Sequence, residues 1–89
     1  MANGKAFENA CLIVQKNSSK INQTELLKLY SYYKQATEGD VKGERPGITD
    51  FRGRAKYEEW TSLKGTTQDQ AKDNYIRLVS NLDLVEKAP

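Results

Sequence analysis

The stretch NQTELLKLYSYYKQATEGD, residues 22–40, carries the start and stop signals of one complete helix. Asn22 with Glu25 three residues later is typical of a helix capping box, and the leucines and tyrosines behind them recur at helical spacing. Gly39 begins a run rich in turn residues, which predicts that the helix ends near Glu38. Because period-two alternation is scarce in the rest of the chain, we expect an all-α fold.

Three further helices are predicted on either side of this stretch. The first, from about residue 5 to 16, presents one apolar stripe: Phe7, Ala10, Cys11 and Val14. The third begins after Asp50 as its cap and is expected to stop at Gly65, since glycine suits the left-handed position after a helix end. It carries Phe51, Ala55, Trp60 and Leu63. Thr67 and Gln70 form another capping box before the fourth helix. That helix carries Ala71, Tyr75, Leu78, Val79 and Leu82.

Length and charge restrict the class of protein. A chain of 89 residues is long enough for one modest core, so we expect a single domain over residues 1–89. A formal net charge of +2 gives little counterion release, which argues against a nucleic-acid partner. The longest apolar run, residues 10–14, is too short for stable membrane insertion or for a signal peptide. One cysteine suits a reducing compartment, so the sequence predicts a soluble cytoplasmic protein.

Several arrangements needed for catalysis or metal binding are missing from the sequence. Without histidine the usual acid/base near neutral pH is absent, and a lone thiol, Cys11, excludes a Cys/His zinc site. The position of Cys11 in an apolar run is more typical of an inert core thiol. Glu58 and Glu59 lie about 100° apart on a helix and do not converge. Asp69 and Asp73 share a helical face, but a solvated face explains them more simply. We therefore expect neither an enzyme nor a metal site.

Tyrosines and basic residues gather at helical spacing in two places. Tyr30, Tyr33 and Lys34 stand at i, i+3 and i+4, and Arg52 and Lys56 stand at i and i+4 on the next helix. If these two faces meet, their ammonium groups and phenol rings suit a phosphorylated ligand with an aromatic ring. Aromatics at such spacing are also common in cores and scattered lysines are commonly solvated. The pattern alone leaves both interpretations open.

A longer segment resembles the acyl-CoA-binding protein family. It reads LYSYYKQATEGDVKGERPGITDFRGRAKYEEWTSLKGTT over residues 29–67 and is followed by A, Y and LV at helical spacing. The family typically has a Tyr-Ser-x-Tyr-Lys-Gln-Ala-Thr-x-Gly-Asp stretch, an Arg-Pro-Gly turn, a Gly-x-Ala-Lys-x-x-x-Trp helix and a Leu-Lys-Gly-Thr stop. The resemblance implies an up-down-down-up four-helix bundle. It also implies an intracellular carrier and pool former that binds medium- and long-chain acyl-CoA thioesters non-covalently, without a cofactor.

The resemblance also implies roles for individual residues. Tyr33 matches the position that stacks on the adenine ring, and Tyr75 matches a ligand tyrosine on the fourth helix. The positions that bind the ribose 3′-phosphate are matched by Tyr30, Lys34 and Lys56. Arg52 replaces a lysine at another ligand-contact position and keeps its charge. Gln15 stands where a ligand-contacting lysine is frequent, and its contribution is left open.

Two other classes of function remain as alternatives. A hydrolase acting on acyl-CoA needs a nucleophile and a base, which a chain without histidine supplies poorly. A helical protein-interaction or peptide-precursor module needs no convergence of tyrosine and lysine, so it should survive the loss of Lys34 and Lys56. Acyl-CoA binding by a monomer is the function that we expect from the sequence.

Overall fold

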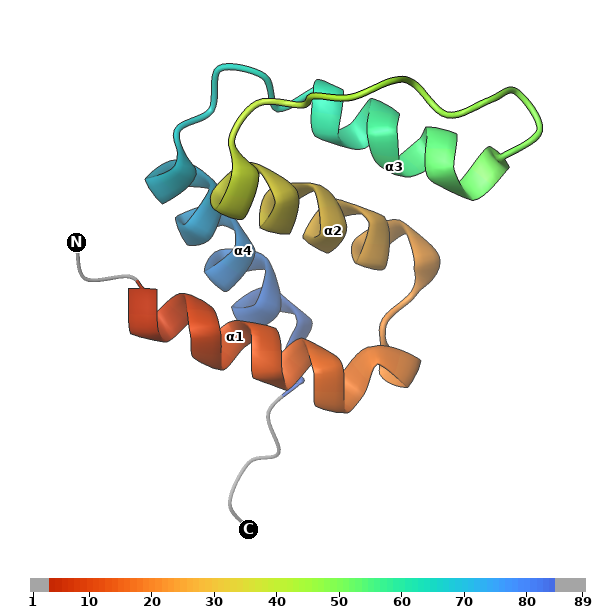
Figure 1. The fold of residues 1–89 in the computed structure, drawn as a ribbon. Coiled ribbons are helices and arrows are strands. Elements are labelled where there is room, and N and C mark those ends of the chain that lie inside the picture. The colour runs from red at the N-terminus through yellow and green to blue at the C-terminus, as the bar shows by residue number, and fades with distance from the viewer. Residues whose placement is uncertain (1–3, 85–89) are drawn as a thin grey trace, which may run out of the picture.

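The computed structural model describes residues 4–84, which form four α-helices, one short 3-10 helix and no strand. The elements are α1 (Gly4–Asn17), η1 (Ser18–Lys20), α2 (Gln23–Glu38), α3 (Phe51–Thr61) and α4 (Gln68–Leu82). Figure 1 shows that α1 and α4 run in one direction and that α2 and α3 run in the other. The predicted all-α, up-down-down-up arrangement is confirmed.

The predicted cap residues begin three of the helices. Asn22, Asp50 and Thr67 each accept a hydrogen bond from the backbone N–H three residues later, at 2.8, 3.0 and 3.0 Å. At Thr67 the Gln70 side chain also accepts from the cap N–H at 3.1 Å, which completes a capping box. Glu25 Oε1 is buried without a hydrogen-bond partner, so the box predicted at Asn22 is closed on one side only.

The end of α3 differs from the prediction. The helix was expected to reach Gly65 but ends at Thr61, and residues 62–65 form turns. Two backbone bonds there, 63 to 60 at 3.0 Å and 64 to 61 at 3.1 Å, join residues three apart and tighten the chain. Gly65 does adopt the left-handed conformation, with φ +93°. The chain leaves the helix early because its next residues turn back to contact the end of α2.

A buried glutamine makes that contact. Gln35 has no exposed surface, and its Nε2 donates to Asp40 Oδ1 at 2.9 Å and to a backbone carbonyl of the α3–α4 connection at 2.7 Å. Asp40 Oδ1 also accepts from the Gly65 N–H at 2.9 Å. These hydrogen bonds hold the pKa of Asp40 below its usual value, and the one from Gly65 has the largest effect. Trp60 Nε1 donates to the Gly39 carbonyl at 2.8 Å, so both helix connections are tied to the end of α2.

Helix α2 is central to the packing, because it contacts both α4 and α3, while α1 packs on α4. The core cluster consists of Phe7, Ala10, Ile21, Leu29, Ala36, Ala71, Tyr75 and Val79. The apolar stripes predicted for α1 and α4 therefore face the core. The set predicted for α3 does not: Trp60 is buried, but Phe51 is 78% exposed. Helix α3 lies on the outside of α2 and has only one side to bury.

Candidate ligand-binding site

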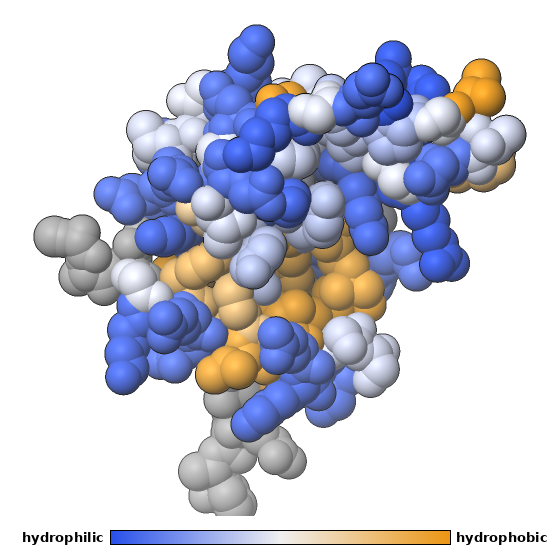
Figure 2. Space-filling model, in the orientation of Figure 1, coloured by the Kyte–Doolittle hydropathy of each residue, from blue (hydrophilic) through white to orange (hydrophobic). Residues whose placement is uncertain are grey.

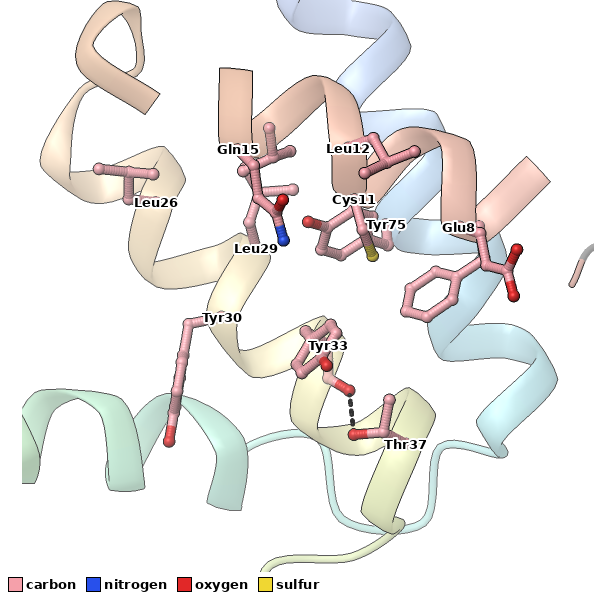
Figure 3. Close-up of a pocket in the computed structure, with 12 residues that line it drawn as sticks. Glu8, Cys11, Leu12, Gln15, Leu26, Leu29, Tyr30, Tyr33, Thr37 and Tyr75 are labelled. Carbon is pink, nitrogen blue, oxygen red and sulfur yellow. Dashed lines mark hydrogen bonds between the residues drawn. The ribbon is translucent and has the colours of Figure 1, made fainter. Parts of the chain in front are cut away.

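A cavity of about 600 Å³ lies where α1, α2 and α4 come together, and we call it the three-helix cavity. Figure 2 shows hydrophobic residues gathered on this face between α1 and α2, and Figure 3 shows the lining side chains. The lining residues are Phe7, Glu8, Cys11, Leu12, Val14, Gln15, Leu26, Leu29, Tyr30, Tyr33, Thr37 and Tyr75. Three of the six predicted site residues, all tyrosines, belong to this set.

Three aromatic rings from three helices form a cluster in this cavity. Phe7 lies 5.1 Å from Tyr75 in an edge-to-face contact and 6.0 Å from Tyr33 in a stacked one, measured between ring centres. Tyr75 is buried, whereas Tyr33 is 44% exposed. The ring of Tyr33 is therefore held from behind by other rings and remains open to a planar ligand.

A polar contact in the cavity wall pairs two side chains that carry no charge, Cys11 and Tyr75. Burial raises the pKa of the Tyr75 hydroxyl, and its contact with Cys11 raises that pKa further. Burial likewise raises the pKa of the Cys11 thiol, which a hydrogen bond with Tyr75 partly offsets. Cys11 is thus a half-buried neutral thiol at the cavity wall, packed against the core as its apolar run predicts. It lacks the depressed pKa of a nucleophile.

A second cavity, of about 470 Å³, lies between α2 and α3, and we call it the α2–α3 cavity. It is lined by Gln23, Thr24, Leu26, Leu27, Tyr30, Arg52, Ala55 and Lys56. Leu26 and Tyr30 line both cavities, so the side chain of Tyr30 stands at the boundary between them. Lys56 Nζ lies 5.0 Å from the centre of the Tyr30 ring, within the range of a cation–π contact.

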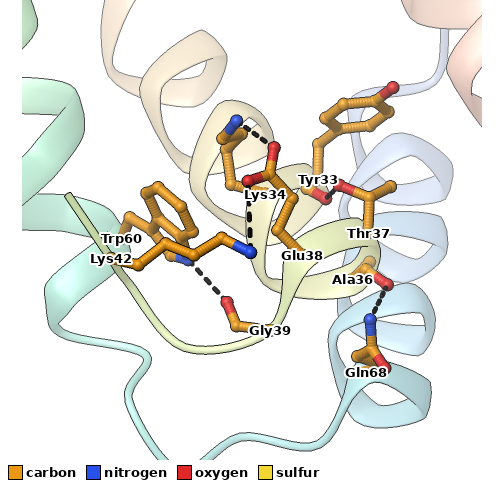
Figure 4. A network of polar contacts seen from close by, with 9 residues as sticks. All are labelled: Tyr33, Lys34, Ala36, Thr37, Glu38, Gly39, Lys42, Trp60 and Gln68. Carbon is orange, nitrogen blue, oxygen red and sulfur yellow. Dashed lines mark hydrogen bonds and ion pairs between the residues drawn. The ribbon is translucent and has the colours of Figure 1, made fainter.

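Lys34 makes a different set of contacts. Its Nζ forms an ion pair with Glu38 Oε2 and lies 5.1 Å from the centre of the Trp60 ring. Lys42 Nζ approaches the other oxygen of Glu38 at 3.9 Å (Figure 4). The hydrogen bond between Lys34 and Glu38 raises the pKa of the lysine and lowers the pKa of the carboxyl group. Both groups are therefore charged at neutral pH, and the ammonium group of Lys34 already has Glu38 as its ion-pair partner.

The structure brings together most of the predicted site residues. Tyr30, Arg52 and Lys56 line one cavity, and Tyr30, Tyr33 and Tyr75 line the other. Lys34 lines neither of these two cavities, although it lies on the same α2–α3 side of the bundle as Lys56. The sequence left open whether the α2 and α3 faces meet, and in the structure the two helices pack against each other.

Sequence reasoning missed two features of the site. It did not recognise Glu38 as the partner of Lys34, although their i, i+4 spacing is the usual one for a helical ion pair. It also treated Phe7 only as a core residue, and nothing in the spacing indicates that its ring supports Tyr33. Gln15, whose contribution was left open, lines the three-helix cavity.

Comparison with known proteins identifies the family. Residues 4–79 match the family model described as acyl CoA binding protein. The chain belongs to the acyl-CoA-binding protein family. It is 45% identical over 76 residues to the acyl-CoA-binding protein of Saccharomyces cerevisiae, which covers 85% of this chain and 87% of the yeast protein.

Solved structures of the family have the same fold. The crystal structure of acyl-CoA-binding protein 2 from Oryza sativa aligns with a TM-score of 0.78 and 32% identity, over 91% of this chain and 90% of that chain. The crystal structure of the family member from Moniliophthora perniciosa aligns with a TM-score of 0.78 and 38% identity, over 89% of this chain and 82% of that chain. The two tyrosine-lined cavities are therefore cavities of an acyl-CoA-binding protein fold.

Metal-binding clusters and membrane-spanning helices are both absent from the described residues. Between residues 4 and 84, no group of three or more His, Cys, Asp or Glu side chains is arranged to hold a metal ion. No helix in the same part of the chain has the length and apolar character that crossing a membrane requires.

Proposed function

We propose that this protein binds medium- and long-chain acyl-CoA thioesters non-covalently and serves as an acyl-CoA carrier and pool former in the cytoplasm. Residues 1–89 act as one acyl-CoA-binding domain, which works as a monomer. The observation that carries the proposal is Tyr30, which stands between two cavities with the ammonium group of Lys56 on its ring. A ligand with an aromatic head, a phosphate and a long apolar tail needs these three environments side by side.

The adenine ring belongs in the three-helix cavity. Tyr33 offers a half-exposed ring there, and Phe7 and Tyr75 hold that ring in place. Stacking of a nucleobase on an aromatic side chain contributes about 1–3 kcal/mol. The amide of Gln15 on the same wall can donate to or accept from the ligand without adding charge.

The ribose 3′-phosphate belongs at the boundary between the cavities. Tyr30 presents its hydroxyl as a donor, and the ammonium group of Lys56 lies over its ring and can turn toward a phosphate there. Lys34 can join them if the phosphate replaces the carboxylate of Glu38 as its partner. Arg52 lines the same cavity as Lys56 and adds a further positive charge beside the bound anion.

The acyl chain belongs in the α2–α3 cavity, beyond Tyr30. Leu26, Leu27 and Ala55 supply apolar wall there, while the stems of Lys56 and Arg52 border it. With the adenine on one side of Tyr30 and the chain on the other, the ligand bends over this residue. The head group then covers part of the acyl chain and shields it from water.

Calorimetry with three ligands tests the function. Palmitoyl-CoA should bind far more tightly than free CoA or free palmitate, because both halves contribute and each buried methylene adds up to roughly 0.8 kcal/mol. Equal affinity for palmitate and its CoA ester would contradict the proposal and indicate a generic fatty-acid carrier. Because we propose binding without catalysis, prolonged incubation with the thioester should release no free CoA.

A further inference from the structure

The two most exposed large hydrophobic residues of the described chain lie three positions apart. Ile48 is 76% exposed and Phe51 is 78% exposed, and neither belongs to the core cluster. They lie where the α2–α3 connection turns into the first residue of α3, at the outer end of that helix (Figure 1). We call Ile48, Phe51 and the turn between them the 48–51 corner. Figure 2 shows hydrophobic surface at this edge of the molecule, apart from the three-helix cavity.

Local hydrogen bonds hold the corner in shape. The Asp50 N–H donates to the Gly47 carbonyl at 3.0 Å, and the Asp50 side chain accepts from the third residue of α3 at 3.0 Å. Arg54 Nη1 reaches the Pro46 carbonyl at 3.4 Å. Backbone groups of the turn are thereby bonded within the protein while the two apolar side chains point outward. Binding through these two side chains therefore costs little conformational entropy, because the backbone of the turn is already ordered.

The surroundings of the corner are basic. Between residues 42 and 56 there are five basic side chains and two acidic ones. The basic residues are Lys42, Arg45, Arg52, Arg54 and Lys56, and the acidic residues are Glu44 and Asp50. The carboxylate of Asp50 is used as the cap of α3. Lys42 and Arg45 keep 65% and 55% of their side chains exposed, although Lys42 lies 3.9 Å from a carboxylate oxygen of Glu38 and Arg45 pairs with Glu58.

We propose that the 48–51 corner is a peripheral docking site for an anionic phospholipid bilayer. Such a bilayer has anionic headgroups above a layer of acyl chains. The apolar side chains of Ile48 and Phe51 suit the acyl-chain layer, and the lysine and arginine side chains that flank them suit the headgroups. A stable protein interface normally covers about 800 Å² on each partner, far more than two side chains offer. Contact through two side chains is shallow and reversible, so it agrees with the expected lack of stable membrane insertion.

The position of the corner gives this contact a use. Arg52 directly follows Phe51 and lines the α2–α3 cavity, which we propose as the site of the acyl chain. Docking through the corner therefore brings the mouth of that cavity close to the bilayer. The docking surface itself does not depend on the proposed function, because it can be measured on the protein without ligand.

Vesicle flotation of the full chain, without acyl-CoA, tests the proposal. The protein should bind vesicles of phosphatidylcholine mixed with phosphatidylglycerol, bind pure phosphatidylcholine far more weakly, and dissociate as salt is raised. The double variant Ile48→Ser/Phe51→Ser should bind the anionic vesicles at least about tenfold more weakly, since two apolar side chains lose their burial. Leu12→Ser removes an apolar side chain of 52% exposure on α1 and should change vesicle binding less than about twofold.

Three results would overturn the proposal. The first is a wild-type protein that does not bind anionic vesicles. The second is a double variant that binds them as well as wild type, and the third is an equal loss of vesicle binding in the double variant and in Leu12→Ser. Sedimentation tests whether the corner instead binds a second copy of the chain. A wild-type protein that dimerises but does not bind vesicles, together with a double variant that is monomeric, would also contradict docking to lipid.

A fluorescent reporter locates the contact. Phe51→Trp places a tryptophan at an exposed position, while the only native tryptophan, Trp60, is buried and supplies a constant background. The added signal should shift to shorter wavelength with anionic vesicles. An unchanged emission on vesicles that carry the protein would place the contact elsewhere and refute the corner as its site. Palmitoyl-CoA calorimetry on the Ile48→Ser/Phe51→Ser protein tests separately whether the acyl-CoA site is intact, so failure of docking and failure of the proposed function are distinguishable.

Discussion

The three-helix cavity and the α2–α3 side of the bundle are organised by different forces. In the cavity, rings from three helices pack against one another, and the one ring left half-exposed is held in place without a ligand. On the α2–α3 side, Lys56 and Lys34 each lie over an aromatic ring of the facing helix, but Lys34 is also paired with Glu38. The aromatic half of the site is therefore preformed, whereas in the cationic half Lys34 must exchange Glu38 for the ligand.

Two lysines of the same site can therefore contribute unequally to ligand binding. The ammonium group of Lys56 lies over the Tyr30 ring and forms no ion pair within residues 4–84, so it can turn toward a phosphate without breaking one. Lys34 must first leave Glu38, which competes with the ligand for the same ammonium group. Exposed ion pairs of this kind are screened by solvent and contribute little, so the competition is modest.

The largest expected effect tests the cationic half. Lys56→Ala should weaken palmitoyl-CoA binding by roughly tenfold or more, since hydrogen bonds to charged groups contribute about 1.5–3 kcal/mol each. If the contact is direct, the same variant should lose little affinity for the 3′-dephospho ester, which lacks the partner group. Equal losses for both esters would show that Lys56 does not bind the 3′-phosphate. Circular dichroism is the control that checks whether the variant is folded.

The next effect tests the aromatic half. Tyr33→Ala should reduce acyl-CoA affinity by about fivefold or more, corresponding to at least about 1 kcal/mol of base stacking. Tyr32, about 100° away on the same helix, is half-buried against the core. Tyr32→Ala should therefore lower the thermal midpoint while the folded protein keeps its affinity. Similar affinity losses in calorimetry of the two variants would mean that Tyr33 has no special contact with the ligand.

A smaller effect sharpens the contrast between the two lysines. Glu38→Gln should raise acyl-CoA affinity by roughly twofold, because it removes the carboxylate that occupies Lys34. Glu58→Gln makes the same charge change in a residue paired with Arg45 and serves as the matched control, expected to leave affinity nearly unchanged. In a Lys34→Ala background the gain from Glu38→Gln should vanish. A loss of affinity in Glu38→Gln would instead show that Glu38 positions Lys34 for the ligand.

The smallest effect concerns the connections that hold α3 against α2, and it has a defined dependence on pH. The folded-state pKa of Asp40 lies below its ordinary value of 3.8, mainly through the hydrogen bond from Gly65. Its stabilising contribution is therefore fully present above the unfolded pKa and is lost as pH falls through the folded pKa. Thermal melts of Asp40→Asn should decline less steeply with acidification below about pH 4 than those of wild type. Identical acid limbs would mean that Asp40 does not clamp the two connections.

The sequence predicted the local features of this fold well. The caps at Asn22, Asp50 and Thr67 each involve a hydrogen bond to a backbone group three residues away, so a few neighbouring letters contain the whole interaction. The left-handed backbone conformation at Gly65 was likewise predicted from the residue at that position. The i, i+4 spacing on α2 and α3 likewise predicted that Tyr30 and Lys56 would meet if the helices packed together, and they do.

The sequence alone predicted four α-helices, the cap residues of three of them, the faces that α1 and α4 bury, and the family to which the chain belongs. Three features became visible in the folded chain alone: Tyr30 stands between two cavities, Lys34 contacts both Glu38 and Trp60, and Phe51 points away from the core. The reason is physical. Caps and stripes depend on atoms a few residues apart along one helix, whereas these three features depend on how one helix is positioned against another, and many distant contacts set that position together.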